Sequence, residues 1–185
     1  MYETVVLISI GAIMKKLTKN EFDELFSIME QSFPSDEYRT RVGQLSVFDD
    51  PRYSAYGEYE DGRLIGFISI WEFDDLIFIE HFAVKPELRG RGIGAKMLSE
   101  LIQNVEKTVC LEVEPPVDGL TMRRIAFYER CGFCYNDYNY TQPSMDVGKN
   151  PIPLRVMTYG SYADPAMFKK IKSILYKNVY HVTED

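Results

Sequence analysis

The chain has 185 residues, of which 45% are hydrophobic and 26% are charged. This length is typical of one domain with a sizeable core, and the composition excludes a disordered chain and a disulfide-stapled miniprotein. The 21 basic and 28 acidic side chains give a net charge of −7, which argues against nucleic acid as a partner, because binding to a phosphate backbone depends on positive charge. We therefore expect a single domain over residues 1–185.

The apolar run from Val5 to Met14 is too short to span a bilayer and follows an acidic residue, so it predicts neither a membrane segment nor a signal peptide. It predicts a strand that enters the core instead. The segment from Met14 to Leu17 looks like an alternative start of the natural protein, and residues 1–13 would then be an upstream extension. The three cysteines form no recognisable disulfide framework, which favours a reducing cytoplasm.

The first half of the chain predicts two helices followed by an antiparallel meander. Thr18 and Glu21 form a capping box ahead of apolar residues at helical spacing, and Ser35 is placed to cap a second helix. Asp61 and Gly62, between two apolar runs, are a two-residue hairpin signal. The elements expected here are a strand at 8–17, helices at 19–32 and about 35–49, and strands at 53–60 and 63–72.

The second half predicts strands that alternate with helices. Pro86 ends the first of these strands, because proline cannot donate to a ladder. Segment 141–153 contains three prolines and a glycine, and we expect a long loop over a binding cleft there. The last helix has an apolar side, which predicts packing within the monomer, with pairing to a second copy as the alternative. The expected elements are strands at 76–84, 109–114, 133–140 and 154–159, and helices at about 92–108, 120–131 and 164–180.

The most informative segment follows the strand at 76–84 and has the sequence Arg89-Gly90-Arg91-Gly92-Ile93-Gly94. Glycines let backbone N–H groups approach an anion closely, a helix start presents free N–H groups, and arginines add positive charge. This combination predicts a phosphate site, and a tight turn with solvated arginines is the alternative. The spacing excludes both a Walker A loop and a G-x-G-x-x-G dinucleotide fingerprint.

These residues resemble the GNAT superfamily of acyl-CoA-dependent N-acyltransferases. The family signature, Arg/Gln-x-x-Gly-x-Gly/Ala after a strand that ends in Val-x-Pro, is similar to residues 89–94 after residues 84–86. A second signature, a helix with a tyrosine that leads into a Gly-Phe step, is similar to residues 124–133. The resemblance implies an α+β or α/β fold, with a mixed and mostly antiparallel sheet of about six or seven strands, flanked by helices. It also implies a V-shaped splay between the fourth and fifth strands.

The resemblance further implies that acetyl-CoA is the co-substrate and lies in that splay. Main-chain groups of the fourth strand would bind the pantetheine and thioester, and the backbone of the glycine-rich turn would cradle the pyrophosphate. Many relatives carry an asparagine about one or two turns before the tyrosine, where it contacts the pantetheine. This chain has Thr121, Met122, Arg123 and Arg124 at those positions, so the contact lacks its usual residue. The cofactor-binding residues implied are Phe82, Ala83, Val84, Arg89, Gly90, Arg91, Gly92, Ile93, Gly94, Ala95 and Arg124.

Acyl transfer to an amine needs a base, because an amine is largely protonated at neutral pH. Glu80 is the candidate, directly or through water, since strand alternation places it on one face with Phe78 and Phe82, where burial would raise its pKa. A structural carboxylate paired with an arginine is the alternative. His81 alternates to the opposite face, which predicts a core or hydrogen-bonded histidine.

The family likeness makes Tyr128 the candidate general acid, which would give its proton to the departing thiolate. A tyrosine packed on an apolar helix is the alternative. Arg124 lies one turn earlier on the same face, where it could support a phenolate, touch a phosphate of coenzyme A or remain solvated. Cys131 and Cys134 have zinc-like spacing but no second pair, so we expect no metal site.

Together these features predict a cytoplasmic N-acetyltransferase that joins acetyl-CoA and a primary amine of a small molecule or peptide in a ternary complex. It would act as a monomer or homodimer, with neither nucleic acid nor a membrane as a partner. The acidic balance favours a cationic amine. The alternative is a non-catalytic acyl-CoA-binding sensor or interaction module, which would bind the same molecule without consuming it.

Overall fold

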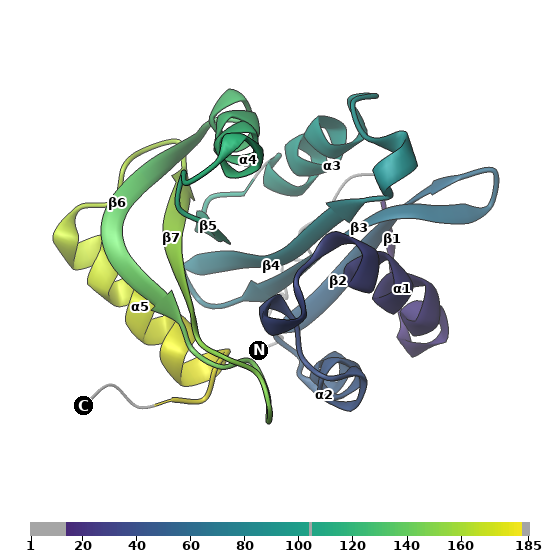
Figure 1. The fold of residues 1–185 in the computed structure, drawn as a ribbon, viewed down its shortest axis with the longest axis horizontal. Coiled ribbons are helices and arrows are strands. Elements are labelled where there is room, and N and C mark those ends of the chain that lie inside the picture. The colour runs from purple at the N-terminus through teal and green to yellow at the C-terminus, as the bar shows by residue number, and fades with distance from the viewer. Residues whose placement is uncertain (1–13, 104, 183–185) are drawn as a thin grey trace, which may run out of the picture.

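The computed structural model describes residues 14–103 and 105–182. They form a seven-stranded sheet with helices on both of its faces (Figure 1). The strands are β1 Lys15–Lys16, β2 Tyr53–Glu60, β3 Arg63–Glu72, β4 Leu76–Val84, β5 Thr108–Val113, β6 Phe133–Gln142 and β7 Ile152–Tyr159. The α-helices are α1 Phe22–Ser32, α2 Arg41–Ser46, α3 Ile93–Ile102, α4 Gly119–Arg130 and α5 Pro165–Asn178. The strand predicted at 8–17 lies mostly outside the described residues, and β1 is its described end.

The strand order is β1-β2-β3-β4-β5-β7-β6, and every neighbouring pair is antiparallel except β4 and β5. The parallel pairing runs only from Leu76 opposite Thr108 to Ile79 opposite Leu111, although β4 continues to Val84. Beyond that last pair the two strands diverge (Figure 1). The mixed, mostly antiparallel sheet and the splay between its fourth and fifth strands are therefore confirmed.

Two apolar layers cover the sheet, one on each face. Helices α1 and α5 pack on one face, which we call the α1/α5 face, through side chains such as Leu25, Met29 and Leu175. Helices α3 and α4 pack on the other, the α3/α4 face, through side chains such as Met97 and Ile125. The packing of α5 on the sheet confirms the prediction that the last helix closes the core of the monomer. Among the described residues, no helix is both long and apolar enough to cross a membrane.

Three predicted boundaries are wrong. Ser35 does not cap the second helix, because residues 35–37 form a separate 3-10 turn and Thr40 caps α2 by accepting from the N–H of Gly43. Helix α3 ends at Ile102 instead of near residue 108, since the chain must become extended to place β5 beside β4. The predicted loop at 141–153 is shorter, because its two ends pair with each other as extensions of β6 and β7.

A β-bulge in β4 decides how its side chains are distributed. The pairing with β3 passes from Ser69 opposite His81 directly to Ile70 opposite Ile79, which leaves Glu80 as an extra residue. Because of this insertion, residue 78 packs on the α1/α5 face while residue 82 packs on the α3/α4 face. The prediction that Glu80 shares one face with both of these residues is therefore wrong.

Candidate active site

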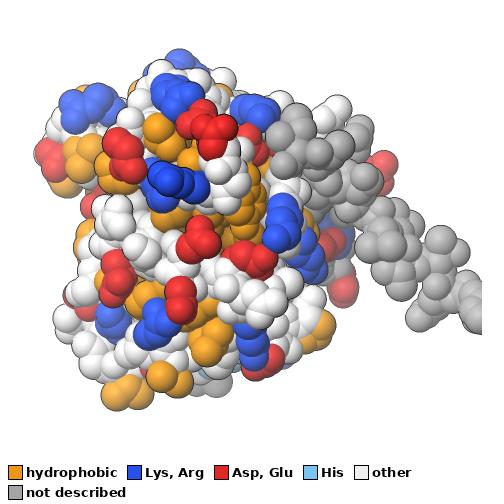
Figure 2. Space-filling model, turned by 90° about the vertical axis from the view of Figure 1, so that its right-hand side faces the viewer, with side chains coloured by type: hydrophobic (Ala, Val, Ile, Leu, Met, Phe, Trp, Pro, Cys, Tyr) orange, Lys and Arg blue, Asp and Glu red, His pale blue; other side chains and the backbone are white. Residues whose placement is uncertain are grey.

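A cavity of about 880 Å³ opens where β4 and β5 diverge. Its lining comes from the connection between α1 and α2, from the second halves of β4 and β5, and from the glycine-rich turn and the start of α3. One side of α4 lines it along the helix, and β6 and β7 contribute Gln142 and Leu154. Figure 2 shows a hollow with hydrophobic side chains at its floor and charged side chains of both signs around it. The cavity reaches both faces of the sheet, because no strand fills the splay between them.

The glycine-rich turn and the start of α3 form one end of this cavity. Gly92 is the N-cap of α3, with a φ of 80°, and no side chain caps the helix. The first N–H groups of a helix have no partner within it, so they are available to an anion in the cavity. A Cβ on Gly94 would lie 3.1 Å from the ring of Phe82, which shows how closely the helix start approaches β4.

Ten of the eleven predicted cofactor-binding residues line the cavity, and Arg91 does not. Arg91 instead forms an ion pair with Glu60, at 2.7 Å between Nη2 and Oε1, and its side chain is 51% exposed. Arg89 lines the cavity and also braces the turn, because its Nε donates to the Val84 carbonyl at 3.0 Å. The surroundings of Arg91 therefore fit the alternative, a solvated arginine, better than a residue that faces a phosphate in the cavity.

Three arginines of α4 line the cavity, and only Arg124 among them was predicted from the sequence. Arg123 and Arg130 were missed, although their spacing of seven residues places them on one side of a helix. Arg124 forms an ion pair with Glu114, which also lines the cavity. The α3/α4 side of the cavity is therefore positively charged, as a phosphate-bearing ligand requires.

The left-handed conformation of Gly92 leads to a stability prediction. We expect Gly92→Ala to lower the free energy of unfolding by about 1–2 kcal/mol, because an L-residue disfavours this conformation even where its Cβ meets no atom. Urea unfolding would measure the loss. Gly119→Ala is the matched control, since Gly119 is not among the glycines with positive φ and its Cβ would approach only the end of the Arg123 side chain. An equal loss in both variants would contradict the prediction.

Tyr128 lies on α4 and lines the cavity from the α3/α4 face. Its ring packs edge-on against Phe127 and Phe133. Burial raises the pKa of Tyr128 to about 12, although the nearby Arg124 lowers it, so the phenol keeps its proton at neutral pH. Within the described part of the chain, no hydrogen bond to its hydroxyl is formed, which leaves the proton free to be donated into the cavity.

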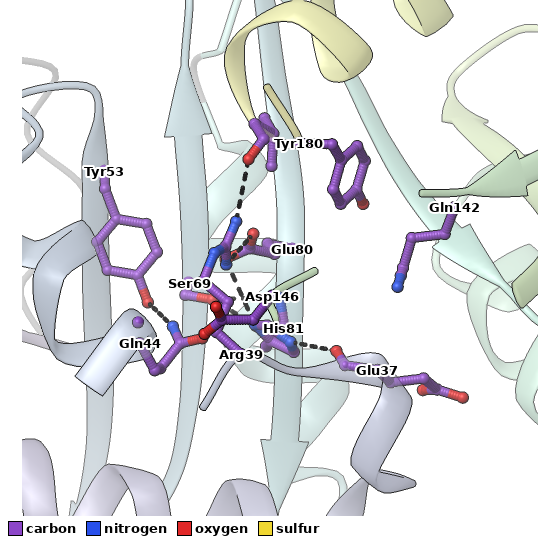
Figure 3. Close-up of polar contacts among 12 residues, drawn as sticks. Glu37, Arg39, Gln44, Tyr53, Ser69, Glu80, His81, Gln142, Asp146 and Tyr180 are labelled. Atoms are coloured by element: carbon purple, nitrogen blue, oxygen red, sulfur yellow. Dashed lines mark hydrogen bonds and ion pairs between the residues drawn. The ribbon is translucent and has the colours of Figure 1, made fainter. Parts of the chain in front are cut away.

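Glu80 does not have the environment predicted for a base. It lies on the α1/α5 side with Arg39, whose Nη1 donates to Glu80 Oε1 at 2.7 Å, and the two side chains are only 7% and 1% exposed (Figure 3). Burial raises the pKa of Glu80, but the charge of Arg39 and the neighbouring His81 outweigh burial and lower it to about 2. The prediction of a raised pKa is therefore wrong. The alternative of a structural carboxylate paired with an arginine describes Glu80 better.

His81 is buried and hydrogen-bonded, as predicted, but it does not lie on the opposite face from Glu80. Its Nδ1 is 3.5 Å from Glu80 Oε2, because the bulge turns both side chains the same way. Its Nε2 lies 2.8 Å from the carbonyl oxygen of Glu37 (Figure 3). Since a carbonyl can only accept, Nε2 must carry a proton and donate it.

Two carboxylates that the sequence did not single out line the α1/α5 side of the cavity, Glu37 and Glu112. Burial raises the pKa of Glu37 to about 7, with a further increase from Glu114 and a decrease from Arg124. Burial also raises the pKa of Glu112 to about 7, although the hydroxyls of Tyr140 and Tyr180 both donate to it. No sequence motif marks either residue, because both reach the cavity only through the tertiary fold.

The remaining predicted features concern metals and thiols. Cys131 and Cys134 are free, as is the buried Cys110. In residues 14–103 and 105–182, no group of three or more His, Cys, Asp or Glu side chains could hold a metal ion. The polar side chains that line the cavity are arginines, carboxylates, Tyr128, His81, Gln142 and Ser32.

Comparison with known proteins identifies the family that has this architecture. The sequence model of the acetyltransferase (GNAT) family matches residues 20–133, which is more than half of the chain. The chain belongs to the GNAT acetyltransferase family. The matched segment includes the glycine-rich turn, the whole of β4 and α4, and the tyrosine at position 128. The family resemblance stated from the two sequence motifs is thus confirmed.

Two Bacillus subtilis proteins illustrate the sequence relationship of this GNAT chain. YjbC, assigned to the acetyltransferases, is 30% identical over 104 residues, which are 55% of this chain and 52% of YjbC. A spermine/spermidine N(1)-acetyltransferase is 28% identical over 99 residues, which are 47% of this chain and 65% of that protein. The matches thus span about half to two thirds of the length of these curated relatives.

Solved structures extend the likeness over nearly the whole GNAT chain. A structure from Bacteroides thetaiotaomicron, assigned to the same family, is 30% identical with a TM-score of 0.83, and the match covers 92% of this chain and 99% of that one. An aminoglycoside 6'-N-acetyltransferase solved with coenzyme A has a TM-score of 0.60 at 14% identity, covering 83% of this chain and 99% of that one. At that identity the second likeness concerns the fold alone.

Proposed function

We propose that this GNAT-family protein transfers the acetyl group of acetyl-CoA to a primary amine of a small cationic molecule or peptide. The observation that carries the proposal is a single cavity with two chemically different sides. One side holds the free N-terminus of α3, Arg89 of the glycine-rich turn and the arginines of α4, and the other holds the carboxylates of the α1/α5 side. A phosphate-bearing acyl donor and a cationic acceptor would therefore meet where β4 and β5 diverge.

The residues present fit acetyl-CoA on three counts. The edge of β4 that faces β5 is unpaired after Ile79, so its main-chain groups are available to the amides of a pantetheine. The start of α3 offers unpaired N–H groups, and Arg89 and Arg123 add positive charge for a pyrophosphate. The cavity volume of about 880 Å³ is within the usual range for a cofactor site.

When bound, acetyl-CoA supplies an activated acyl group as a thioester. In the proposed reaction the amine nitrogen forms a bond with the acetyl carbon while the carbon–sulfur bond breaks. Tyr128 holds a proton on its hydroxyl and would give it to the departing sulfur, whose own basicity rises in the same buried space. Arg124 would limit the cost of the resulting phenolate, since it already lowers the pKa of Tyr128.

The acceptor is proposed from charge. Glu37 and Glu112 line the acceptor side, while the nearby Arg39 is neutralised by Glu80. This leaves a negative surface that favours an ammonium group. The relative named as a spermine/spermidine N(1)-acetyltransferase supports a polyamine-like acceptor, although only 47% of this chain is matched to it. A reducing cytoplasmic location, in keeping with the three free cysteines, belongs to the same proposal.

The decisive experiment is incubation with acetyl-CoA and a panel of polyamines, aminoglycosides, amino acids and peptides, with release of free thiol as the readout. We expect thiol release that depends on a cationic acceptor. Coenzyme A should also raise the melting temperature, because it binds only the folded state. Thermal stabilisation without acceptor-dependent thiol release would instead favour the non-catalytic sensor, and the absence of both would contradict the proposed function.

A further inference from the structure

Four carboxylates line the cavity, and three of them are already engaged. Glu80 is ion-paired with Arg39, and Glu114 is ion-paired with Arg124. Glu112 accepts hydrogen bonds from two tyrosine hydroxyls, one on each carboxylate oxygen. Glu37 differs from the other three, because no described residue forms a hydrogen bond or ion pair with its carboxylate.

We infer that Glu37 is the catalytic base that removes a proton from the acceptor amine, and that Glu80 serves to hold Arg39. This inference rests on the proposed acetyl transfer and deepens it by naming a residue that was not a sequence candidate. In Figure 3 the side chain of Glu37 points away from the Arg39–Glu80 pair. Its carboxylate is therefore free to meet a substrate on the α1/α5 side of the cavity.

The turn that carries Glu37 is braced from several directions. His81 donates from Nε2 to the Glu37 carbonyl at 2.8 Å, which ties the turn to the bulge of β4. The loop between β6 and β7 holds the other side, since Lys149 Nζ donates to the carbonyl of Ser35 at 2.6 Å and the Asn150 N–H to Asp36 at 3.0 Å. His81 is thus a positioning residue, and the base is held in place although its carboxylate has no partner.

Charged and titratable groups surround Glu37 on every packed element. The bulge of β4 contributes Glu80 and His81, β5 and its end contribute Glu112 and Glu114, and α4 contributes Arg124 and Tyr128. Burial is the largest influence on Glu37 and raises its pKa to about 7, with Arg124 and His81 acting in the opposite sense. A carboxylate with that pKa is about half ionised at neutral pH and accepts a proton more readily than an ordinary one.

The proton balance of the reaction is complete with these two residues. The ammonium gives one proton to the Glu37 carboxylate, and the neutral nitrogen then attacks the acetyl carbon. The carbon–sulfur bond breaks as Tyr128 gives its proton to sulfur, and the second nitrogen proton returns to the phenolate as the amide forms. Glu37 finally releases its proton to water, so one proton is produced in each turnover.

The test is the pH dependence of kcat in Glu37→Gln, with the acceptor identified by the panel. We expect wild-type kcat to fall below pH 7 as Glu37 becomes protonated. In the variant we expect kcat to drop about 10²- to 10⁴-fold, the usual contribution of a general base. The fall of kcat below pH 7, which we call the acidic limb of the profile, should disappear. Glu37→Asp should keep this acidic limb, with a lower kcat than the wild type. Stabilisation by coenzyme A should persist in both variants, which separates lost chemistry from lost folding.

Two further variants make the result specific. Glu112 has a similar pKa, so Glu112→Gln must keep the acidic limb if Glu37 causes it. Glu30→Gln removes one exposed carboxylate of α1 outside the cavity and should behave as wild type. A limb that survives Glu37→Gln or vanishes in Glu112→Gln would overturn the assignment of Glu37. If the wild type acetylates no amine, the proposed function fails instead, which is a different outcome.

Discussion

Replacing Tyr128 with phenylalanine should lower kcat about 10²- to 10⁴-fold while changing the affinity for coenzyme A less than about threefold. The reason is that the ring remains packed against Phe127 and Phe133, whereas the phenol proton proposed for the departing sulfur is lost. Steady-state kinetics with acetyl-CoA and calorimetric titration with coenzyme A would measure the two quantities.

A matched control for this substitution is Tyr162→Phe, since Tyr162 is 75% exposed and does not line the cavity. It should leave both kcat and the affinity unchanged. A loss of kcat within about threefold in Tyr128→Phe would contradict the role of general acid. It would favour the alternative, in which the tyrosine only packs on the helix. A large loss of coenzyme A affinity would instead indicate that the hydroxyl binds the cofactor.

The second large effect concerns stability. Arg39→Met should lower the free energy of unfolding by about 3–5 kcal/mol, because it leaves Glu80 buried without its partner. Arg39 also donates from Nη2 to the carbonyl of Val179 at 3.2 Å and lies over the ring of Trp71, so further contacts are lost. Chemical denaturation at pH 7.5 would measure the change.

The pH dependence of this loss has a defined sign. In the wild type the pKa of Glu80 is lowered to about 2, so the pair stabilises the fold above the ordinary carboxyl pKa and loses this effect as the pH falls toward 2. In Arg39→Met, burial without a partner raises the pKa of Glu80, and protonation relieves the unpaired charge. The variant should therefore be closer to wild type at pH 5 than at pH 7.5.

The double variant Arg39→Met with Glu80→Gln should recover a substantial part of the lost stability, because no buried charge is then left unpaired. Equal instability of the single and double variants would show that the other contacts of Arg39, and not the charge of Glu80, carry the effect. A deficit that stays constant between pH 5 and pH 7.5 would point the same way.

Much of the fold follows from local sequence signals. The Asp61-Gly62 pair predicts the hairpin between β2 and β3, and both residues have the positive φ that such a turn needs. The Thr18–Glu21 capping box is present as predicted, although it begins a 3-10 turn that leads into α1. These signals involve residues that are close in the sequence, so they can be recognised without knowledge of the tertiary structure.

The cofactor side of the candidate site is predictable for the same reason. The turn at 89–94 joins a strand to a helix, and its glycines and arginines are neighbours in sequence. Arg91 stays a predicted cofactor-binding residue, but a turn has two sides, and only the tertiary structure shows that this side chain lies outside the cavity lining and pairs with Glu60.

The acceptor side was decided by tertiary structure alone. The interpretation of Glu80 assumed that successive side chains of β4 point to alternate faces of the sheet, and the bulge interrupts this alternation. The sequence does not reveal the inserted residue, because the strand is a run of mostly apolar side chains. Glu37 and Arg39, both from the connection between α1 and α2, approach Glu80 of β4 and Glu112 of β5 only when the helices pack on the sheet. The sequence by itself determined the helices, the hairpin and the glycine-rich turn, because each depends on adjacent residues. Which carboxylates are paired and which is free was decided by the tertiary structure, because pairing depends on distances between segments.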